Sequence, residues 1–295
     1  NDFNYYFSSL NNLISVDLSN FKAGSGIRMQ YMFSGCQYLE YVHLPNFSDK
    51  TIYYMNYMFN NCKSLKSLDM SRINTRNPST ISYIFSGCNS LISLDISNFD
   101  LYNIGSFSFL NNIKNTLQYL NITNVKTYTN YLSYSFQNFY SLISIDLTNI
   151  YISSATNLNN LFYNCFSLES IDLSNLNTKN VINMSSLFYN CTNLKFVNLS
   201  NLNTDKAQYM DYMFNNCSSL NSIDLSNLDT SSVKNMEGMF NNCYNLEYVN
   251  IKNINAKSAE NMDKMFYKCS NLKYINFYFI NKNVQNITDI FSGSS

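Results

Sequence analysis

The stretch MFNNCSSLNSIDLSNLD, residues 213–229, decides the fold because close copies of it recur along the whole chain. Its phenylalanine, Phe214, belongs to a series in which most neighbours stand 26 residues apart. The series consists of Phe7, Phe33, Phe59, Phe85, Phe109, Phe136, Phe162, Phe188, Phe214, Phe240, Phe266 and Phe291. A fixed period of about 20 to 50 residues predicts a solenoid, in which each repeat buries its apolar face against its neighbours.

Two different periodicities share each repeat. Ile223 and Leu225 flank Asp224 and alternate with polar residues, as in a short strand with one buried face. From Met236 to Cys243 the apolar residues are spaced 3, 1 and 3 apart, which is typical of one face of a short helix. We therefore predict an α/β solenoid of about eleven 26-residue repeats, with a parallel sheet on one face and short helices or helical turns on the other.

The same regularity predicts one elongated solenoid over residues 1–295, because each repeat contacts only its neighbours. One repeat, near residues 100–131, is irregular: Phe85 and Phe109 are 24 residues apart, and Phe109 and Phe136 are 27 apart. We expect a local bulge on the helical side there, with the sheet continuous. The chain starts at Asn1 and stops inside a repeat, so we expect it to be a fragment of a longer chain.

Charge and hydropathy exclude several classes of protein. Lysine plus arginine equals aspartate plus glutamate at 19 each, and no basic cluster occurs that would bind nucleic acid. No stretch of about 18 apolar residues is present, so this segment is not expected to insert into a membrane.

The eight cysteines occupy one column of the repeat, namely Cys36, Cys62, Cys88, Cys165, Cys191, Cys217, Cys243 and Cys269. Apolar residues such as Leu10 and Phe139 fill this column elsewhere, so it selects for apolar volume, and we predict buried, reduced thiols. The chain lacks a CxxC pair and has a single histidine, His43, which argues against a zinc site. The methionines also belong to core columns. We therefore expect neither a metal nor a cofactor.

Catalytic motifs are missing from the sequence. There is no glycine-rich phosphate loop, no GxSxG and no HExxH. A hydrolase with paired carboxylates stays open as an alternative, but aspartates repeated at every turn define no unique centre. We predict a protein that is not an enzyme.

The polar column of the strands is the main candidate for function. It reads Asp17, His43, Asp69, Asp95, Asn121, Asp146, Asp172, Asn198, Asp224, Asn250 and Asn276, with tyrosine or phenylalanine interrupting the neighbouring serine column. Exposed aromatic rings among hydroxyls and amides suit protein or sugar ligands. The predicted binding site comprises Asp146, Asp172, Phe196, Asn198, Asp224, Tyr248 and Asn250. A merely solvated face and a calcium-binding carboxylate ladder are the alternatives. A second, asparagine ladder three residues on (Asn20, Asn46, Asn98 and their equivalents) is expected to satisfy turn backbone groups.

Residues 220–251 (LNSIDLSNLDTSSVKNMEGMFNNCYNLEYVNI) and 168–191 (LESIDLSNLNTKNVINMSSLFYNC) resemble the BspA-like leucine-rich repeat family. The resemblance covers essentially the whole chain, more loosely from Asp100 to Tyr131. It implies a leucine-rich-repeat solenoid, extracellular or cell-surface placement, and adhesion or ligand binding. Many relatives have tryptophan where this chain has Phe47, Phe99, Leu176, Leu202 or Leu228, which leaves the subgroup open.

We therefore expect a non-catalytic cell-surface or secreted repeat protein that binds a protein or glycan on a host, a matrix or a neighbouring cell. The main alternative is a structural subunit that self-associates end to end into an extracellular filament or coat. An intracellular scaffold is a third reading. Fold alone does not decide among them.

Overall fold

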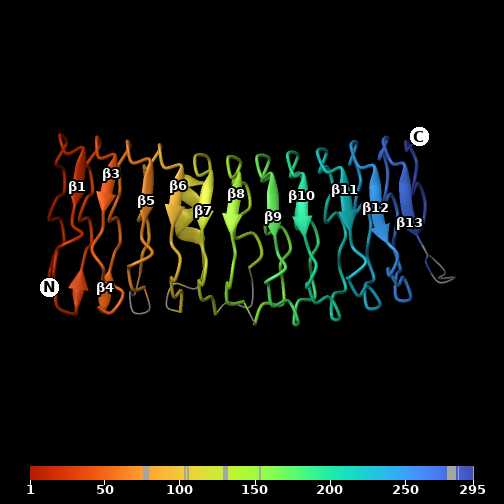
Figure 1. The fold of residues 1–295 in the computed structure, drawn as a ribbon, viewed down its shortest axis with the longest axis horizontal. Helices are drawn as coiled ribbons and strands as arrows, with labels where there is room; N and C mark the ends of the chain where they lie inside the picture. The colour runs from red at the N-terminus through yellow and green to blue at the C-terminus, as the bar shows by residue number, and fades with distance from the viewer. Residues whose placement is uncertain are drawn as a thin grey trace. The chain divides into compact units, whose positions relative to one another are not determined.

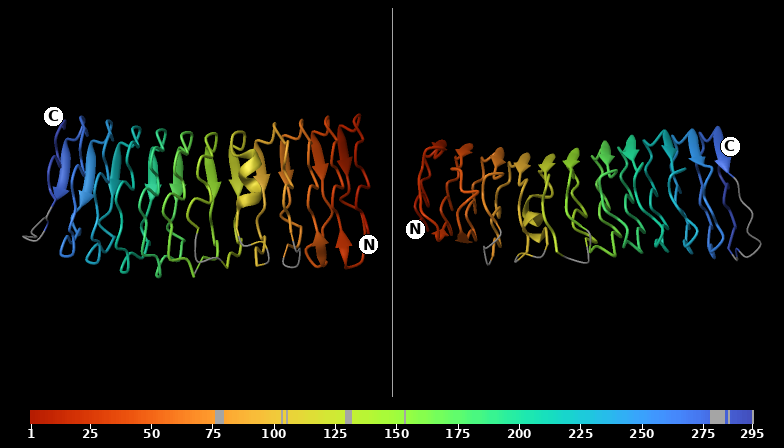
Figure 2. Two further views of the ribbon diagram at one scale, coloured as in Figure 1. Left: turned by 180° about the vertical axis from the view of Figure 1, so that it is seen from behind. Right: turned by 60° about the horizontal axis from the view of Figure 1, so that its bottom comes forward.

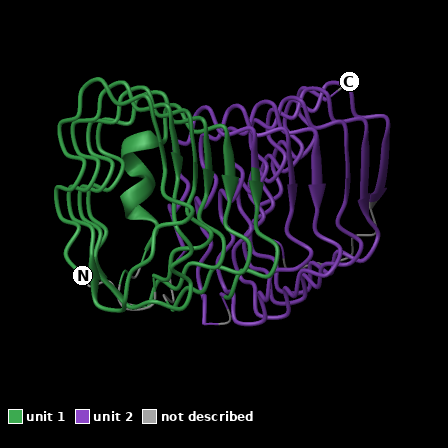
Figure 3. Ribbon diagram, turned by 60° about the vertical axis from the view of Figure 1, so that its left-hand side comes forward, with its two compact units in different colours: residues 1–128, 145–151 green, residues 129–144, 152–295 purple. Residues whose placement is uncertain are grey.

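The computed structural model of the protein describes residues 1–75, 80–102, 104, 106–128, 132–152, 154–277, 284 and 286–294. It is a leucine-rich-repeat solenoid of short parallel strands, and each repeat forms one coil (Figure 1). The chain divides into two compact units. Unit 1 comprises residues 1–128 and 145–151, and unit 2 comprises residues 129–144 and 152–295 (Figure 3). The single solenoid over residues 1–295 stays a prediction, and the two units are described separately.

In unit 1, short strands repeat once per coil. They are β1 (Ser15–Asp17), β3 (Tyr41–His43), β5 (Ser67–Asp69), β6 (Ser93–Asp95), β7 (Tyr119–Asn121) and β8 (Ser144–Asp146), whose first residue is assigned to unit 2, with a second pair, β2 (Ile27–Arg28) and β4 (Ile52–Tyr54). β1 pairs with β3, β2 with β4, and β5, β6, β7 and β8 form one sheet in that order. The β6–β7 register places Ser93 opposite Tyr119, an offset of one repeat.

In unit 2 the strands are β9 (Ser170–Asp172), β10 (Phe196–Asn198), β11 (Ser222–Asp224), β12 (Tyr248–Ile251) and β13 (Tyr274–Phe277). β9 pairs with β10, and β11, β12 and β13 form a second sheet in that order. All of these pairs are parallel, and Ser222 faces Tyr248 across one repeat. In β11 the middle residue, Ile223, is buried while Ser222 and Asp224 are exposed, as the alternating pattern predicts.

The core is built from the apolar columns, and phenylalanine stacks run through it. In unit 2, Phe188, Phe214 and Phe240 are fully buried and lie nearly parallel, with centroids 5.4 and 5.5 Å apart. A cysteine thiol bonds to the backbone of this stack: the Sγ of Cys217 donates to the carbonyl oxygen of Phe188 at 3.2 Å. All eight thiols are buried, as predicted.

The layer opposite the strands differs from the expected helical turns. In unit 2 the amides of Tyr212, Phe214 and Asn216 donate to carbonyl groups of the next coil, at 2.7 to 2.9 Å. The intervening amides of Asn215 and Cys217 donate back three residues at 3.1 Å, which closes successive β-turns. An α-helix bonds its amides within itself, whereas here every second amide is used between coils. Tyr212 and Asn216 accordingly have φ values of +55° and +59°.

The described residues contain one helical element, the 3-10 helix η1 (Ser108–Ile113), and it lies in the irregular repeat of unit 1. Figure 2 shows it as the yellow coiled ribbon in the layer behind β6 and β7. Phe109, Leu110 and Ile113 of η1 are buried. The sheet continues from β6 to β7 past this helix. The bulge on the helical side stays a prediction.

Candidate functional site

The Asp/Asn column of the strands is first of all a turn-capping column. The Oδ1 of Asp224 accepts the backbone amide of Ser226 at 2.8 Å, and Asp172 accepts that of Ser174 at the same distance. Asn198 makes the equivalent bond at 3.1 Å, so aspartate and asparagine serve equally. A side-chain oxygen that accepts the amide two residues on is an Asx turn, which bends the chain at the end of each strand.

Neighbouring members of the column also bind each other. The Nδ2 of Asn198 donates to Oδ2 of Asp172 at 3.0 Å, and Asn121 donates to Asp95 at 2.9 Å. An asparagine beside an aspartate therefore replaces repulsion between stacked carboxylates with a hydrogen bond. The column is therefore stabilised where asparagine stands beside aspartate, whereas Asp69 faces Asp95 directly.

These contacts set the pKa values of the carboxyl groups. Burial alone would raise the pKa of Asp172, but hydrogen bonds from Ser174 and Asn198 outweigh it and hold the pKa below its ordinary value. The same balance lowers the pKa of Asp224, with Ser226 and Asn250 as donors. The Thr148 side chain and amide lower the pKa of Asp146. At neutral pH these side chains are anions.

Six of the predicted site residues lie in unit 2, and Asp146 lies in unit 1. Four of the six surround one hollow of about 310 Å³ on the strand face, namely Phe196, Asn198, Asp224 and Tyr248. Asp172 and Asn250 do not line it; they cap neighbouring turns and contact Asn198 and Asp224, respectively. The structure therefore places four of the seven predicted site residues around one hollow. The sequence analysis had not predicted this hollow.

The hollow arises from one small residue between two large ones. Phe196, Ser222 and Tyr248 occupy equivalent positions on β10, β11 and β12, and Phe196 and Tyr248 are 60% and 42% exposed. One face of Tyr248 is covered by Tyr274, whose ring is parallel at 4.9 Å. Ser222 forms the floor between the rings, and Ser200 and Asn227 contribute further polar groups. Asp224 is the one charged residue among those that line the hollow.

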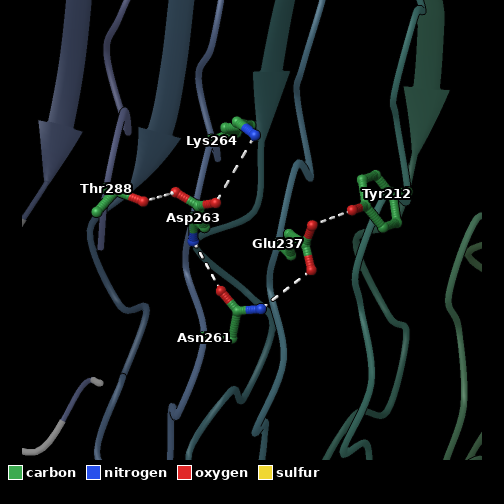
Figure 4. Close-up of polar contacts among 6 residues, drawn as sticks. All are labelled: Tyr212, Glu237, Asn261, Asp263, Lys264 and Thr288. Carbon is green, nitrogen blue, oxygen red and sulfur yellow. Dashed lines mark hydrogen bonds and ion pairs between the residues drawn. The ribbon is translucent and has the colours of Figure 1, made fainter. Parts of the chain in front are cut away.

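A second polar cluster, on the turn layer of unit 2, was missed by the sequence analysis (Figure 4). Tyr212 donates its hydroxyl to Glu237, and Asn261 donates to the other oxygen of Glu237 at 3.0 Å. Asp263 accepts from Thr288 and lies 4.0 Å from the ammonium of Lys264. The acidic residues Glu237 and Asp263 stand one repeat apart, and this spacing is the sequence signal from which the cluster could have been predicted.

Two pKa values in this cluster are raised. Burial, with the Glu237 charge a minor cause, raises the pKa of Asp211, whose Oδ1 accepts the Ser185 hydroxyl at 2.7 Å. Burial and the bond to Glu237 raise the pKa of Tyr212. The acidic side chains of this cluster accept hydrogen bonds from neighbouring side chains of the same layer. Throughout the described ranges, no group of three or more His, Cys, Asp or Glu side chains is placed to hold a metal ion.

The pKa directions predict how stability depends on pH. Carboxyl groups with lowered folded-state pKa values stabilise the fold above their unfolded pKa of about 3.9, and this stabilisation is lost as the pH falls through the folded value. We expect the urea midpoint to fall on acidification below about pH 4, and to fall less in Asp172→Asn. The raised pKa of Asp211 contributes with the opposite sign: it adds stability as the pH falls from the folded pKa toward about 3.9, and Asp211→Asn should remove that gain. A midpoint that rises on acidification would contradict this prediction.

The sequence matches a known family of proteins. A model described as "Mycoplasma protein of unknown function, DUF285" matches residues 1–120, 106–223 and 190–295. The chain belongs to the DUF285 family. A comparison with curated proteins gave no match. Among the described residues of this DUF285 protein, no helix has the length and apolar composition that a membrane span requires.

Several solved structures similar to this DUF285 chain are named leucine-rich proteins. A leucine-rich cell surface protein from Faecalibacterium prausnitzii is 15% identical, with a TM-score of 0.31, over 95% of this chain and 86% of that one. A leucine-rich repeat protein from Eubacterium ventriosum is 19% identical, with a TM-score of 0.39, over 95% of this chain and 82% of that one. For the Drosophila Toll–Spatzle complex the sequence identity is 14% and the TM-score is 0.42. The match covers 83% of this chain but 35% of that one. At these identities the similarity concerns the fold alone.

Proposed function

We propose that this chain is a non-catalytic cell-surface or secreted repeat protein that recognises a ligand through the strand face of unit 2. The observation that carries the proposal is the hollow in which exposed Phe196 and Tyr248 flank Ser222 beside the ionised Asp224. Clustered aromatic anchors beside a polar floor are the usual core of a recognition surface. The resemblance to the BspA-like family supports placement outside the cell.

The chemistry of the hollow favours a protein ligand that inserts a basic side chain. A guanidinium or ammonium group between two aromatic rings gains cation–π attraction, and Asp224 supplies the opposite charge. No cationic residue lines the hollow to compete for that carboxylate. A glycan ligand, which would stack on the same rings, is the alternative outcome of the experiment below.

The test measures saturable binding of the labelled protein to intact cells or matrix. We expect the double variant Phe196→Ala/Tyr248→Ala to bind at least about tenfold more weakly, because aromatic hot spots carry most of the binding energy. The matched control is Tyr41→Ala/Tyr119→Ala, which removes two rings of similar exposure from the same strand column in unit 1. The control should bind like the wild type, and an equal loss in both variants would refute the proposal.

Further measurements separate the alternatives. Binding that disappears after protease treatment of the target, and that weakens in Asp224→Asn, identifies a protein ligand with a basic group. Asp224→Asn keeps the turn cap, as Asn198 shows in the same column. Binding that instead needs intact glycans identifies a glycan. Concentration-dependent filaments without saturable binding would favour the structural-subunit alternative. Antibody labelling of intact producing cells tests the surface location.

A further inference from the structure

A separate hollow of about 400 Å³ opens in unit 1, beside the irregular repeat. It lies where η1 takes the place of a regular turn segment, and Ile81, Tyr83, Ser108, Phe109, Asn111 and Asn112 are among the residues that line it. Its volume is in the range of small-molecule sites, about 300 to 1,000 Å³. The hollow at Phe196 lies in unit 2 and shares no residue with this one.

An aromatic stack ends at this hollow. Tyr5, Tyr31, Tyr57 and Tyr83 stand one repeat apart, and their rings are stacked with centroids 4.8, 4.8 and 5.1 Å apart. In the next repeat the residue two positions before Phe109 is Phe107, which directly precedes η1 and is buried. In the described part of the chain, no ring follows Tyr83 in the stack, and Tyr83 is 54% exposed. The stack therefore presents one open aromatic face to the hollow.

Two backbone amides also lose their partners there. In the preceding coil the amides of Met55 and Tyr57 donate to the carbonyl groups of Thr80 and Ser82, at 3.4 and 3.2 Å. The amides of Ile81 and Tyr83 are the equivalent donors of the next coil, and among the described residues neither has a backbone or side-chain acceptor. An unpaired amide is costly unless water or a ligand oxygen accepts from it.

The rest of the lining is neutral. Ser108, Asn111 and Asn112 offer hydroxyl and amide groups, Ile81 and Phe109 offer apolar surface, and none of the lining residues carries a charge. Such a site favours an uncharged ligand with many hydroxyl groups, an acceptor oxygen for the amides and one flat face for Tyr83. The C–H face of a pyranose ring suits the negative face of an aromatic ring.

We propose that this hollow binds a neutral N-acetylated hexosamine. The pyranose ring would stack on the open face of Tyr83, and its acetamido oxygen would accept from the amides of Ile81 and Tyr83. The acetyl methyl group would lie against Phe109, while Asn111 and Asn112 bond the ring hydroxyls. A sugar that lacks the acetamido group would leave the two amides unpaired, so the site should discriminate against it.

The experiment titrates the full chain with N-acetylglucosamine, glucose and glucosamine, followed by saturation-transfer and amide chemical-shift NMR. We expect saturable binding of N-acetylglucosamine, about tenfold tighter than binding of either other sugar, with shifts at Tyr83 and in η1. Chito-oligosaccharide and an N-glycan with terminal N-acetylglucosamine, titrated separately, distinguish the two sources of such a ring. Absence of saturable binding to N-acetylglucosamine would overturn the proposal.

The stack supplies a matched pair of variants. Tyr83→Asn removes the ring at the hollow, and Tyr5→Asn removes the ring at the other end of the same stack. Both residues have positive φ, +57° and +60°, which asparagine tolerates, and both rings are more than half exposed. Tyr83→Asn should weaken binding about tenfold, whereas Tyr5→Asn and Tyr83→Phe should bind like the wild type. Unchanged binding in Tyr83→Asn, or an equal loss of binding in Tyr5→Asn, would overturn the proposed hexosamine site.

Discussion

Phe214→Ala should lower the free energy of unfolding of unit 2 by about 3 to 5 kcal/mol, the usual cost of truncating a buried phenylalanine. The ring has no exposed surface and lies between Phe188 and Phe240 at 5.4 and 5.5 Å. Its removal takes a contact from both neighbouring coils at once. A solenoid is held together by contacts between adjacent repeats, so the substitution weakens two of these interfaces. Few neighbouring side chains can move to fill the cavity that the ring leaves.

The matched control is Phe196→Ala. The two phenylalanines are 18 residues apart, but Phe196 is 60% exposed on the strand face. Its truncation should change the free energy of unfolding by less than about 1 kcal/mol, as for surface substitutions generally. Urea unfolding followed by circular dichroism measures both. Equal destabilisation by the two variants would show that the phenylalanine stack does not carry the core.

The second large effect concerns the thiols, which should react with a thiol reagent at least about a thousandfold more slowly in the folded protein than after unfolding. Burial raises the pKa of Cys88 and of Cys269 to about 12. The thiolate is the reactive form, and near pH 8 a rise from the ordinary value of about 8.5 removes nearly all of it. The protein around each sulfur also blocks access by the reagent.

Colorimetric labelling in buffer and in concentrated urea tests this expectation. All eight cysteines are free and buried, so urea should release eight reactive thiols and native buffer very few. Phe214→Ala should accelerate labelling, because opening of the coils becomes easier. Rapid labelling of the native wild type would contradict the arrangement of the cysteine column.

The fold was largely predictable because the repeat superimposes the same chemistry many times. A column filled by cysteine in eight repeats and by Leu10 or Phe139 elsewhere indicates an apolar site, whatever the exact backbone. The strand motif was equally clear, since Ile223 and Leu225 alternate with polar residues. The length of the period then determined the parallel register.

The turn layer was not predictable from spacing. Apolar residues 3, 1 and 3 apart fit a helix and also fit successive turns, and the structure uses the turns. The deciding property is positive φ at residues such as Tyr31 and Tyr212, with values of +57° and +55°. Tyrosine rarely takes this conformation, so a tyrosine at these positions does not indicate positive φ. The backbone adopts it because every second amide then reaches the next coil.

The candidate site was half predictable. Phe196 and Tyr248 were recognised as exposed rings, but the hollow between them depends on Ser222, which looked like every other serine of its column. The role of the Asp/Asn column in capping turns was also missed. The sequence analysis had assigned turn backbone groups to the asparagines three residues later. Asn253 does donate to Ser226 in this way, but Asn98 and Asn124 instead take positive φ.

The turn layer of unit 2 also contains a row of asparagine side chains. Asn164 donates its Nδ2 to Oδ1 of Asn138 at 2.9 Å, Asn190 donates to Asn164 at 2.8 Å, and Asn216 donates to Asn190. Every carboxamide therefore points the same way, from the later coil to the earlier one. Turning a single member over would set oxygen against oxygen on one side and amino group against amino group on the other. The row can reverse only as a block, so its direction is a collective property that no single asparagine determines.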